Sequence, residues 1–405
     1  MTTHVDAPAR RSRRGPTTRA ERALAPDLAR GAMLLLIALA HSTGVFFASV
    51  PGVDVTPHGL ERFYNVFQFT FVHARGLPLF AIMFGYGLIQ LAARQDAAGS
   101  PPSAVRALLL RRNAWLFGFG MVHGVFLFGG DILGAYGLIG IVFTLLLLRR
   151  SDRFYRIVVG YAVFAALYVL ALGVMVALGM ANDPNGRSEI PVGDFSSWSA
   201  DSYLASVLVR LGEWPIGTAI FLPFILFIWM GAWAARRRVL EEPHHHRTLL
   251  RGGLVAGFAV SILGGLPMGL ISGGFLHVGD TTAAWTKMLY EGSGLFGGVG
   301  YFCLFGLIAL ALSKRPAPRG VVVQAVSALG QRSLSGYLFQ SAAWLVLASP
   351  YLLALDEKTG QPTFVAVGCA LAVWLTSVVV AYRMQRRAYR GPAETLLRRL
   401  AYGRG

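Results

Sequence analysis

Charged residues are scarce in this chain. Of its 405 residues only 14% are charged and 55% are hydrophobic, and the mean hydropathy is +0.54. A soluble domain needs a largely polar surface, so this composition excludes an ordinary soluble globular protein. Long apolar runs separated by short basic clusters are instead typical of a protein that crosses a membrane several times.

Acidic residues and cysteines are also few. The chain has 20 acidic against 37 basic residues, and two cysteines, Cys303 and Cys369. Both cysteines lie inside apolar runs, which indicates packing residues and excludes a disulfide framework. No phosphate-loop motif occurs, and the three adjacent histidines at 244–246 lack the spacing of a metal site, so we predict no bound metal.

Ten apolar runs account for most of the chain. Each approaches or exceeds the about 20 residues that a helix needs to cross a bilayer, and helices satisfy their backbone hydrogen bonds within the segment. We therefore predict an all-α, polytopic membrane bundle of ten transmembrane helices within residues 25–385. The predicted spans are 32–50, 74–93, 113–130, 132–148, 156–180, 214–235, 250–273, 291–313, 334–354 and 363–383.

The basic residues alternate from one side of these spans to the other. Thirty of the 37 lysines and arginines fall in the two tails and every second loop, and six fall in the intervening loops. By the positive-inside rule both termini are cytoplasmic, in a multi-pass protein of the plasma membrane. The basic face then meets anionic lipid headgroups, which explains the net charge of +17 without a nucleic-acid partner.

Three segments flank or interrupt the predicted bundle. Residues 1–24 are rich in Arg, Pro and Thr and are expected to be a disordered cytoplasmic tail, and residues 386–405 a second basic cytoplasmic tail. The external segment 181–213 is expected to carry an amphipathic helix on the membrane surface. Its apolar spacing comes from Trp198, Tyr203, Leu204, Val207 and Leu211.

Several of the 48 glycines recur at intervals of four residues. Such spacing lets two helices approach closely in lipid, so we predict glycine-mediated helix contacts. The pairs are Gly120 and Gly124, Gly130 and Gly134, and Gly294 and Gly298.

Ionisable residues inside a membrane are costly, so each is a candidate for function. In the first span, Arg30 and His41 are eleven residues apart, or about 16 Å along one helix face. An arginine at the inner surface suits a phosphate group, and a deeper histidine suits a general base. The alternatives are an arginine that extends to the headgroups and a histidine that only packs in the core.

Two further stretches place ionisable residues at the predicted outer side. His73 and Arg75 precede the second span, as interfacial anchors or as ligands for an anionic group. Asp131 lies at the turn between two spans, where it is positioned to cap the following helix. Capping does not explain His123, which lies about two turns further into the membrane.

A polar stripe runs along the ninth span. Its spacing places all members on one helix face, which must contact other helices or water and not lipid. The stripe either forms interhelical hydrogen bonds or lines a substrate path. Its members are Ser333, Tyr337, Gln340, Ser341 and Trp344.

These stretches together resemble the YeiB-like family of bacterial multi-span membrane proteins over residues 25 to 385. Four motifs carry the resemblance, and the third is the most specific. They are Asp27, Arg30 and Gly31; "LFAIMFGYG" at 79–87; His123, Gly124, Gly130, Asp131, Ile132, Leu133 and Tyr136; and Ser333, Leu334, Tyr337, Gln340 and Ser341.

The family resembles transmembrane acyltransferases, which pass an acyl group from cytoplasmic acyl-CoA to an acceptor beyond the membrane. In one branch an essential histidine follows the arginine of the first span after ten residues, as His41 follows Arg30 here. The YeiB-like pattern more often has asparagine at this position. The resemblance therefore implies acyl-CoA as co-substrate and a small-molecule, glycan or lipid acceptor.

Three functions remain open at this level. In an acyltransferase, His41, His123 and Asp131 are the candidate catalytic residues. The candidate binding residues are Arg30, His73, Arg75, Tyr136, Ser333, Tyr337 and Gln340. A proton-coupled transporter could use the same residues, although the two halves of the chain show no convincing repeat. A non-catalytic membrane subunit is the third reading.

Overall fold

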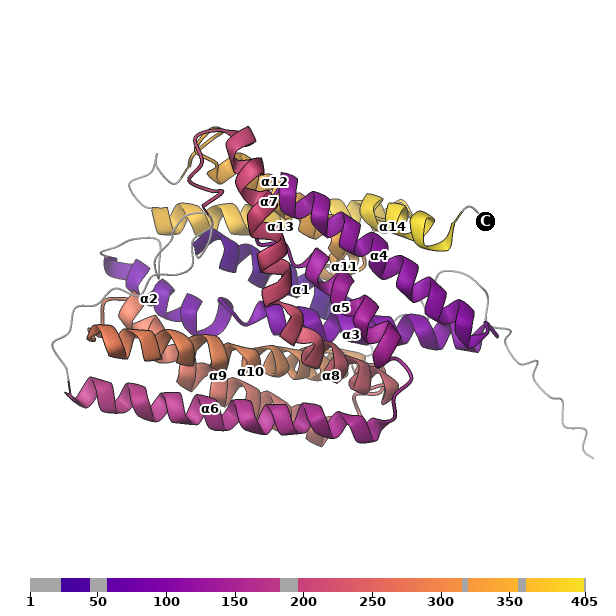
Figure 1. Cartoon of the computed structure of the whole chain (residues 1–405), viewed down its shortest axis with the longest axis horizontal. Helices are drawn as coiled ribbons and strands as arrows, with labels where there is room; N and C mark the ends of the chain where they lie inside the picture. Colours follow the sequence, from indigo (N-terminus) through magenta and orange to yellow (C-terminus); the bar gives the residue numbers. More distant parts are fainter. Residues whose placement is uncertain (1–22, 44–56, 183–195, 315–319, 356–361, 404–405) are drawn as a thin grey trace, which may run out of the picture.

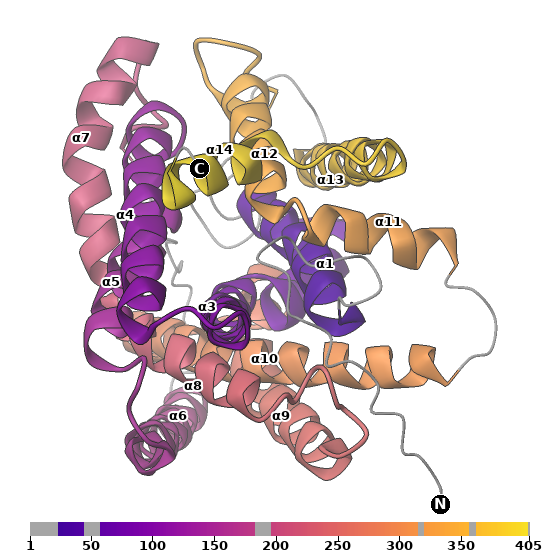
Figure 2. The same cartoon turned by 90° about the vertical axis from the view of Figure 1, so that its right-hand side faces the viewer.

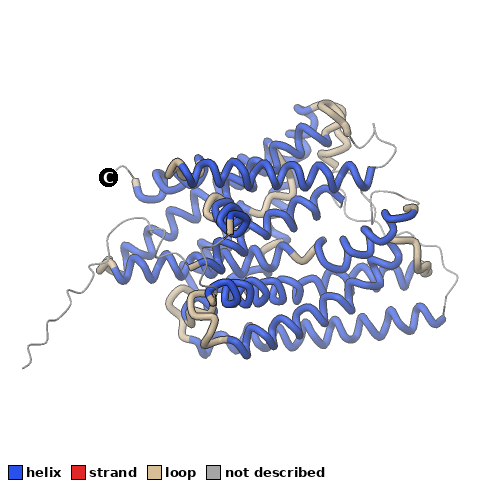
Figure 3. Tube along the Cα trace, turned by 180° about the vertical axis from the view of Figure 1, so that it is seen from behind, coloured by secondary structure: helices blue, strands red, loops and turns tan. Residues whose placement is uncertain are grey.

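The computed structural model describes residues 23–43, 57–182, 196–314, 320–355 and 362–403. Every regular element in these ranges is helical and none is a strand, as Figure 3 shows. This confirms the predicted all-α class. The tail predicted over 1–24 lies almost wholly outside the described residues.

The described residues form long helices and several shorter helical elements. The long helices are α1 (Leu24–His41), α3 (Gly76–Ala97), α4 (Pro102–Phe126), α5 (Leu133–Leu146), α6 (Tyr155–Asn182), α7 (Tyr203–Ile220), α8 (Ile225–Arg236), α9 (Arg247–Ser272), α10 (Asp280–Ser313), α12 (Ser333–Ala348) and α13 (Pro362–Arg386). Shorter elements are α2 (Gly59–Phe67), η3 (Gln68–Val72), η4 (Asp152–Phe154), η5 (Leu222–Phe224), α11 (Val321–Gly330) and α14 (Pro392–Tyr402).

Helices α1 and α3 lie in the middle of the bundle. In Figure 2 they separate a group formed by α4, α5 and α7 from a second group formed by α11, α12 and α13. Below them, α8, α9 and α10 form a third group, with α6 on its outer edge (Figures 1 and 2). The closest pairings are α9 with α10, α4 with α5, α3 with α8 and α1 with α11.

The outward faces of these helices are apolar. On α6, Phe164 is 66% and Leu170 is 64% exposed, which a membrane tolerates and water does not. Seven helical stretches are long and apolar enough to cross a bilayer, so the described structure is that of a multi-pass membrane protein. The number of ten spans, the cytoplasmic termini and the identity of the membrane stay predictions.

Glycine contacts hold the central helices together. A Cβ atom on Gly85 of α3 would lie 1.9 Å from the carbonyl oxygen of Ile228, and one on Gly231 of α8 equally close to that of Ile82. The two backbones therefore touch at both positions, as the small-residue rule for membrane helices expects.

Among the predicted glycine pairs, Gly120 of α4 packs on the backbone of Gly134 in α5. Gly294 and Gly298 of α10 pack on the chain at Ala74 and Leu79. The prediction of glycine-mediated contacts is confirmed at these positions. Gly124 has a different neighbour, the indole ring of Trp214.

Helix α7 includes the last part of the predicted external segment 181–213, of which residues 183–195 lie outside the described structure. It begins at Tyr203 and continues to Ile220, packed against α4 and α5. Its apolar residues point outward, with Leu204 69% exposed, while its polar residues are buried. The buried positions recur every four residues: Ser206, Arg210, Trp214 and Thr218. Helix α7 thus has the inverted amphipathicity of a helix between lipid and a polar interior.

The C-terminal segment predicted as a basic tail folds as α14. Glu394 accepts hydrogen bonds from the backbone N–H groups of Leu334 (2.8 Å) and Ser335 (3.1 Å). A carboxylate at the N-terminus of α12 complements the exposed amides and the helix dipole. Helix α14 thereby contacts both α12 and α4, between which it lies in Figure 2.

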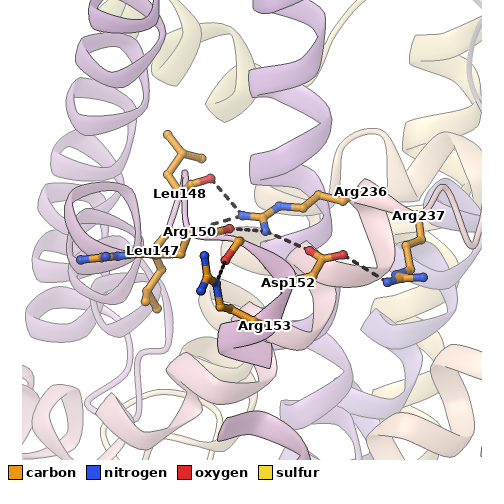
Figure 4. Close-up of polar contacts among 8 residues, drawn as sticks. Leu147, Leu148, Arg150, Asp152, Arg153, Arg236 and Arg237 are labelled. Atoms are coloured by element: carbon orange, nitrogen blue, oxygen red, sulfur yellow. Dashed lines mark hydrogen bonds and ion pairs between the residues drawn. The ribbon is translucent and has the colours of Figure 1, made fainter. Parts of the chain in front are cut away.

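A second polar contact joins the ends of α5 and α8 (Figure 4). Arg236 donates to the carbonyl oxygens of Leu148 (3.0 Å) and Arg150 (2.8 Å), just beyond the C-terminus of α5. Arg236 and Arg237 both reach the carboxylate of Asp152, at 3.5 and 3.2 Å. Arg236 thereby satisfies carbonyl groups that the helix end leaves without partners.

The α3–α8 contact generates a prediction. Gly85→Ala forces the two backbones apart and should lower the free energy of unfolding by about 1–3 kcal/mol. Gly160→Ala on α6 is the matched control, because its new Cβ would have no neighbour within 4 Å. Thermal unfolding in detergent compares the two variants with the wild type. An unchanged melting temperature for Gly85→Ala would contradict the assigned contact.

Candidate functional site

The turn between α4 and α5 presents a buried carboxylate. Asp131 is 1% exposed and accepts hydrogen bonds from the backbone N–H groups of Leu133 (3.0 Å) and Gly134 (2.6 Å). It therefore caps the N-terminus of α5, as the sequence predicts. The indole Nε1 of Trp214 also donates to it, at 3.3 Å.

The same carboxylate binds a histidine on α4. His123 Nδ1 lies 2.7 Å from Asp131 Oδ1, and both side chains are at most 1% exposed. An ionised carboxylate only accepts, so Nδ1 carries the proton and Nε2 is the basic nitrogen. Nε2 is buried and has no hydrogen-bond partner among the described residues. This arrangement orients a base and leaves its reactive atom available.

Three glycines make room for this pair. Gly120 approaches Asp131, and Gly124 and Gly134 both approach the ring of Trp214, closely enough that a Cβ atom would lie within 3.0 Å of each neighbour. Any larger residue would displace the indole from the carboxylate. The glycines of the hairpin motif are therefore explained by the position of Asp131 and Trp214.

Two further histidines belong to the same neighbourhood, and His41 is the one that connects them with His123. His41 ends α1, and both His73 and His123 are near enough to interact with it electrostatically. Phe128 packs on His41, with ring centroids 5.1 Å apart. His73 hydrogen-bonds through Nδ1 to the hydroxyl of Tyr290. Three of the candidate site residues thus come together, although they are up to 82 residues apart in sequence.

Arg75 is a structural residue in this neighbourhood. It is completely buried, and its three guanidinium nitrogens donate to Ser261 Oγ (3.2 Å), Ser261 O (3.1 Å) and His73 O (2.9 Å). The guanidinium also lies 4.7 Å from the ring centre of Tyr290. Its predicted role in binding an anionic group stays untested, but every nitrogen already has a protein partner.

The polar stripe of α12 faces the interior. Tyr337, Gln340, Ser341 and Trp344 are all at most 1% exposed. The ring of Tyr337 lies 5.0 Å from that of His123. Its hydroxyl is close to Asp131 and the backbone of Ile132, but makes no hydrogen bond of good geometry among the described residues.

Three further candidates from the family motifs have contacts or positions in other parts of the bundle. Ser333 begins α12 and is only half-buried, at the end where α14 docks. Tyr136 is buried and donates its hydroxyl to the carbonyl oxygen of Leu77 at 3.0 Å. Gln340 donates to the carbonyl oxygen of Leu34 at 3.2 Å, and its own amide oxygen is buried without a partner among the described residues.

A cluster of arginines lies near the start of α1. Arg30 donates to the carbonyl oxygen of Met83 at 3.1 Å, and Arg30 and Arg94 are both near enough to Arg112 for their charges to interact. Arg112 is half-buried and lies 5.6 Å from the ring centre of Phe84. Like charges gathered in this way attract an anion. We call Arg30, Arg94 and Arg112 the arginine cluster.

Sequence reasoning did not identify three residues on α7 as part of the site. These are Arg210, Glu213 and Trp214, and Trp214 contacts Asp131 directly. The sequence feature that could have identified them is the recurrence of Ser206, Arg210, Trp214 and Thr218 every four residues, which places these side chains on one helix face. We instead predicted from the neighbouring apolar spacing an amphipathic helix on the membrane surface.

The buried carboxylate generates a prediction about stability. Asp131→Ala removes the acceptor of four donors and should cost about 3–5 kcal/mol. Asp152→Ala is the control, because its ion pairs are half-exposed and worth about 0–1 kcal/mol. Melting temperatures in detergent measure both. Equal effects of the two substitutions would show that the Asp131 contacts contribute little.

Comparisons with known proteins agree with this architecture. Residues 234–404 match the family described as "Protein of unknown function (DUF418)". The chain is 24% identical to YxaH of Bacillus subtilis (strain 168), with 96% of each protein covered. It is 25% identical to YeiB of Escherichia coli (strain K12), over 94% of this chain and 96% of YeiB.

A 39.9 kDa protein encoded in the amylase 3′ region of Bacillus acidopullulyticus is 24% identical, with 93% of each chain covered. No solved structure matches the chain. The matches extend over nearly the whole length of all three relatives. These similarities support the predicted resemblance to the YeiB-like family, and the match to the DUF418 family lies in the C-terminal part of this chain.

Proposed function

We propose that the protein is a transmembrane acyltransferase that moves an acyl group from cytoplasmic acyl-CoA to an acceptor on the other side of the membrane. The observation that carries this proposal is the buried His123–Asp131 pair, with its Nδ1–Oδ1 distance of 2.7 Å and its Nε2 without a partner among the described residues. A carboxylate, an imidazole and an open Nε2 are the parts of a general base.

The pair is suited to activate a hydroxyl or amine. His123 Nε2 takes the proton of the acceptor, whose oxygen or nitrogen attacks the thioester carbonyl carbon. The carbon–sulfur bond then breaks, and the imidazolium returns the proton to the departing thiolate. Asp131 stabilises the imidazolium, and the hydroxyl of Tyr337, whose ring centre lies 5.0 Å from that of His123, would donate to the oxyanion.

The arginine cluster is the proposed binding site for the acyl donor, acyl-CoA. Guanidinium groups bind phosphate oxygens through paired hydrogen bonds, and coenzyme A carries several phosphates. Arg30 and His41 lie on the same helix, about 16 Å apart along its axis. The pantetheine arm is an extended chain that would lead from phosphates at the arginine cluster toward the histidines.

A proton-coupled transporter is the second candidate. The proximity of His41, His73 and His123 favours it, because a series of imidazoles can pass a proton through the membrane. In that case the protein would take up a solute into vesicles under a proton gradient and would not cleave a thioester.

His123 is the first residue to test. His123→Gln should lower acyl transfer about 100- to 10,000-fold, because the general base is lost. The assay is the release of the coenzyme A thiol from a series of acyl-CoA thioesters by proteoliposomes. His277→Gln is the control, since His277 is exposed. Full activity in both His123→Gln and His41→Ala would refute the assignment of the base.

Donor binding is a separate test. Arg30→Ala and Arg112→Ala should each weaken acyl-CoA binding to the detergent-purified protein by about tenfold or more, because each removes a phosphate ligand worth about 1.5–3 kcal/mol. Arg251→Ala, which removes an exposed arginine of α9, should bind as the wild type does. If the folded wild type shows no saturable binding, the transporter becomes the better candidate.

A further inference from the structure

Arg210 is the most unusual polar residue of the described structure. It is 0% exposed, and its Nε, Nη1 and Nη2 atoms are all buried without a hydrogen-bond partner in the described part of the chain. Its one ring contact is with Trp198, at 5.3 Å from the guanidinium carbon to the ring centre. A buried charge without partners is strongly unfavourable, so it needs an explanation beyond packing.

Arg75 shows that this fold can satisfy a buried arginine. It is equally buried, and each of its nitrogens donates to a protein oxygen. An arginine retained only for structure would be expected to have such partners. The open nitrogens of Arg210 therefore indicate a partner that is not part of the protein.

Glu213 lies one turn along the same helix face. Its Oε1 accepts the backbone N–H of Ser197 at 3.0 Å, while its Oε2 is buried and has no partner among the described residues. Both side chains are near Gly129, where an added Cβ would meet Glu213 Oε2 at 2.6 Å and Arg210 Cγ at 3.6 Å. Arg210 and Glu213 nevertheless form no ion pair within the described ranges, although they are three residues apart.

These two residues adjoin the His123–Asp131 pair. Trp214, next to Glu213 in sequence and one turn from Arg210, donates its indole N–H to Asp131. Trp198 contacts Phe128 at 5.9 Å between ring centres, and Phe128 contacts His41. Arg210 is thus linked to His41 through the rings of Trp198 and Phe128, and its helix is linked to Asp131 through Trp214.

We propose that Arg210 and Glu213 bind a head group that carries both an anionic group and a hydrogen-bond donor such as ammonium. Arg210 would bind the carboxylate or phosphate oxygens, and Glu213 Oε2 would accept the donor. A purely anionic ligand would be repelled by Glu213, and a purely cationic one by Arg210. The guanidinium nitrogens of Arg210 and the Oε2 atom of Glu213 are buried. A neighbouring side chain such as Trp198 therefore moves when the ligand enters.

The assignment of this ligand as the acyl acceptor rests on the proposed function. The binding site itself does not, so the two are tested apart. Binding is measured without any acyl donor, on the full-length protein in detergent, by thermal stabilisation. The probes are serine and phosphoethanolamine, which carry ammonium with a carboxylate or a phosphate, beside acetate, inorganic phosphate and ethylamine.

We expect serine or phosphoethanolamine to raise the melting temperature of the protein in a saturable way. Binding of serine would indicate a carboxylate ligand, and binding of phosphoethanolamine a phosphate ligand. Arg210→Gln and Glu213→Gln should each weaken this binding by tenfold or more. Arg62→Gln is the matched control, because Arg62 donates to the carbonyl oxygens of Gly273 and Gly274, both at 2.7 Å, away from this site. No stabilisation by either probe, or equal affinity for acetate or phosphate alone, would overturn the proposal.

The ligand-free variants give a second measurement. If Arg210 has no protein partner, Arg210→Gln removes an unpaired charge and should melt at the same or a higher temperature than the wild type. A lower melting temperature would show a structural role and overturn the proposal. The release of the coenzyme A thiol is measured in parallel. If the probe binds but no acyl group is transferred, the proposed function is refuted and the proposed binding site is not.

Discussion

The carboxylate of Asp131 is the interaction on which the site depends. It receives two backbone N–H groups of α5, the indole of α7 and the imidazole of α4, so three helices meet at one side chain. In an apolar bundle each of these donors would be costly to bury alone. The carboxylate thus fixes the turn, the position of Trp214 and the orientation of His123 together.

The close approach of helices follows from the same constraint. An indole can reach Asp131 only because Gly124 and Gly134 have no side chain in its path. Elsewhere, Gly85 and Gly231 bring α3 and α8 into backbone contact. Lipid provides little hydrophobic drive for helix association, so close packing of this kind must supply much of it.

Polar groups in the bundle fall into two classes. Arg75, Asp131 and Tyr136 have protein partners and are explained by the fold. His123 Nε2 and the guanidinium of Arg210 are buried without partners among the described residues, a condition that folding alone disfavours. This difference separates residues that hold the structure from those for which a ligand is the simplest partner.

The sequence by itself determined the helical class, the membrane character, the capping role of Asp131 and the resemblance to the YeiB-like proteins, because hydropathy and local motifs are properties of the sequence alone. It also indicated that His41 and His123 are out of place in hydrocarbon. Only the tertiary structure brought these histidines together and added Trp214 and Arg210. It also decided which face of α7 is buried, because in lipid that depends on the neighbouring helices and not on which residues are apolar.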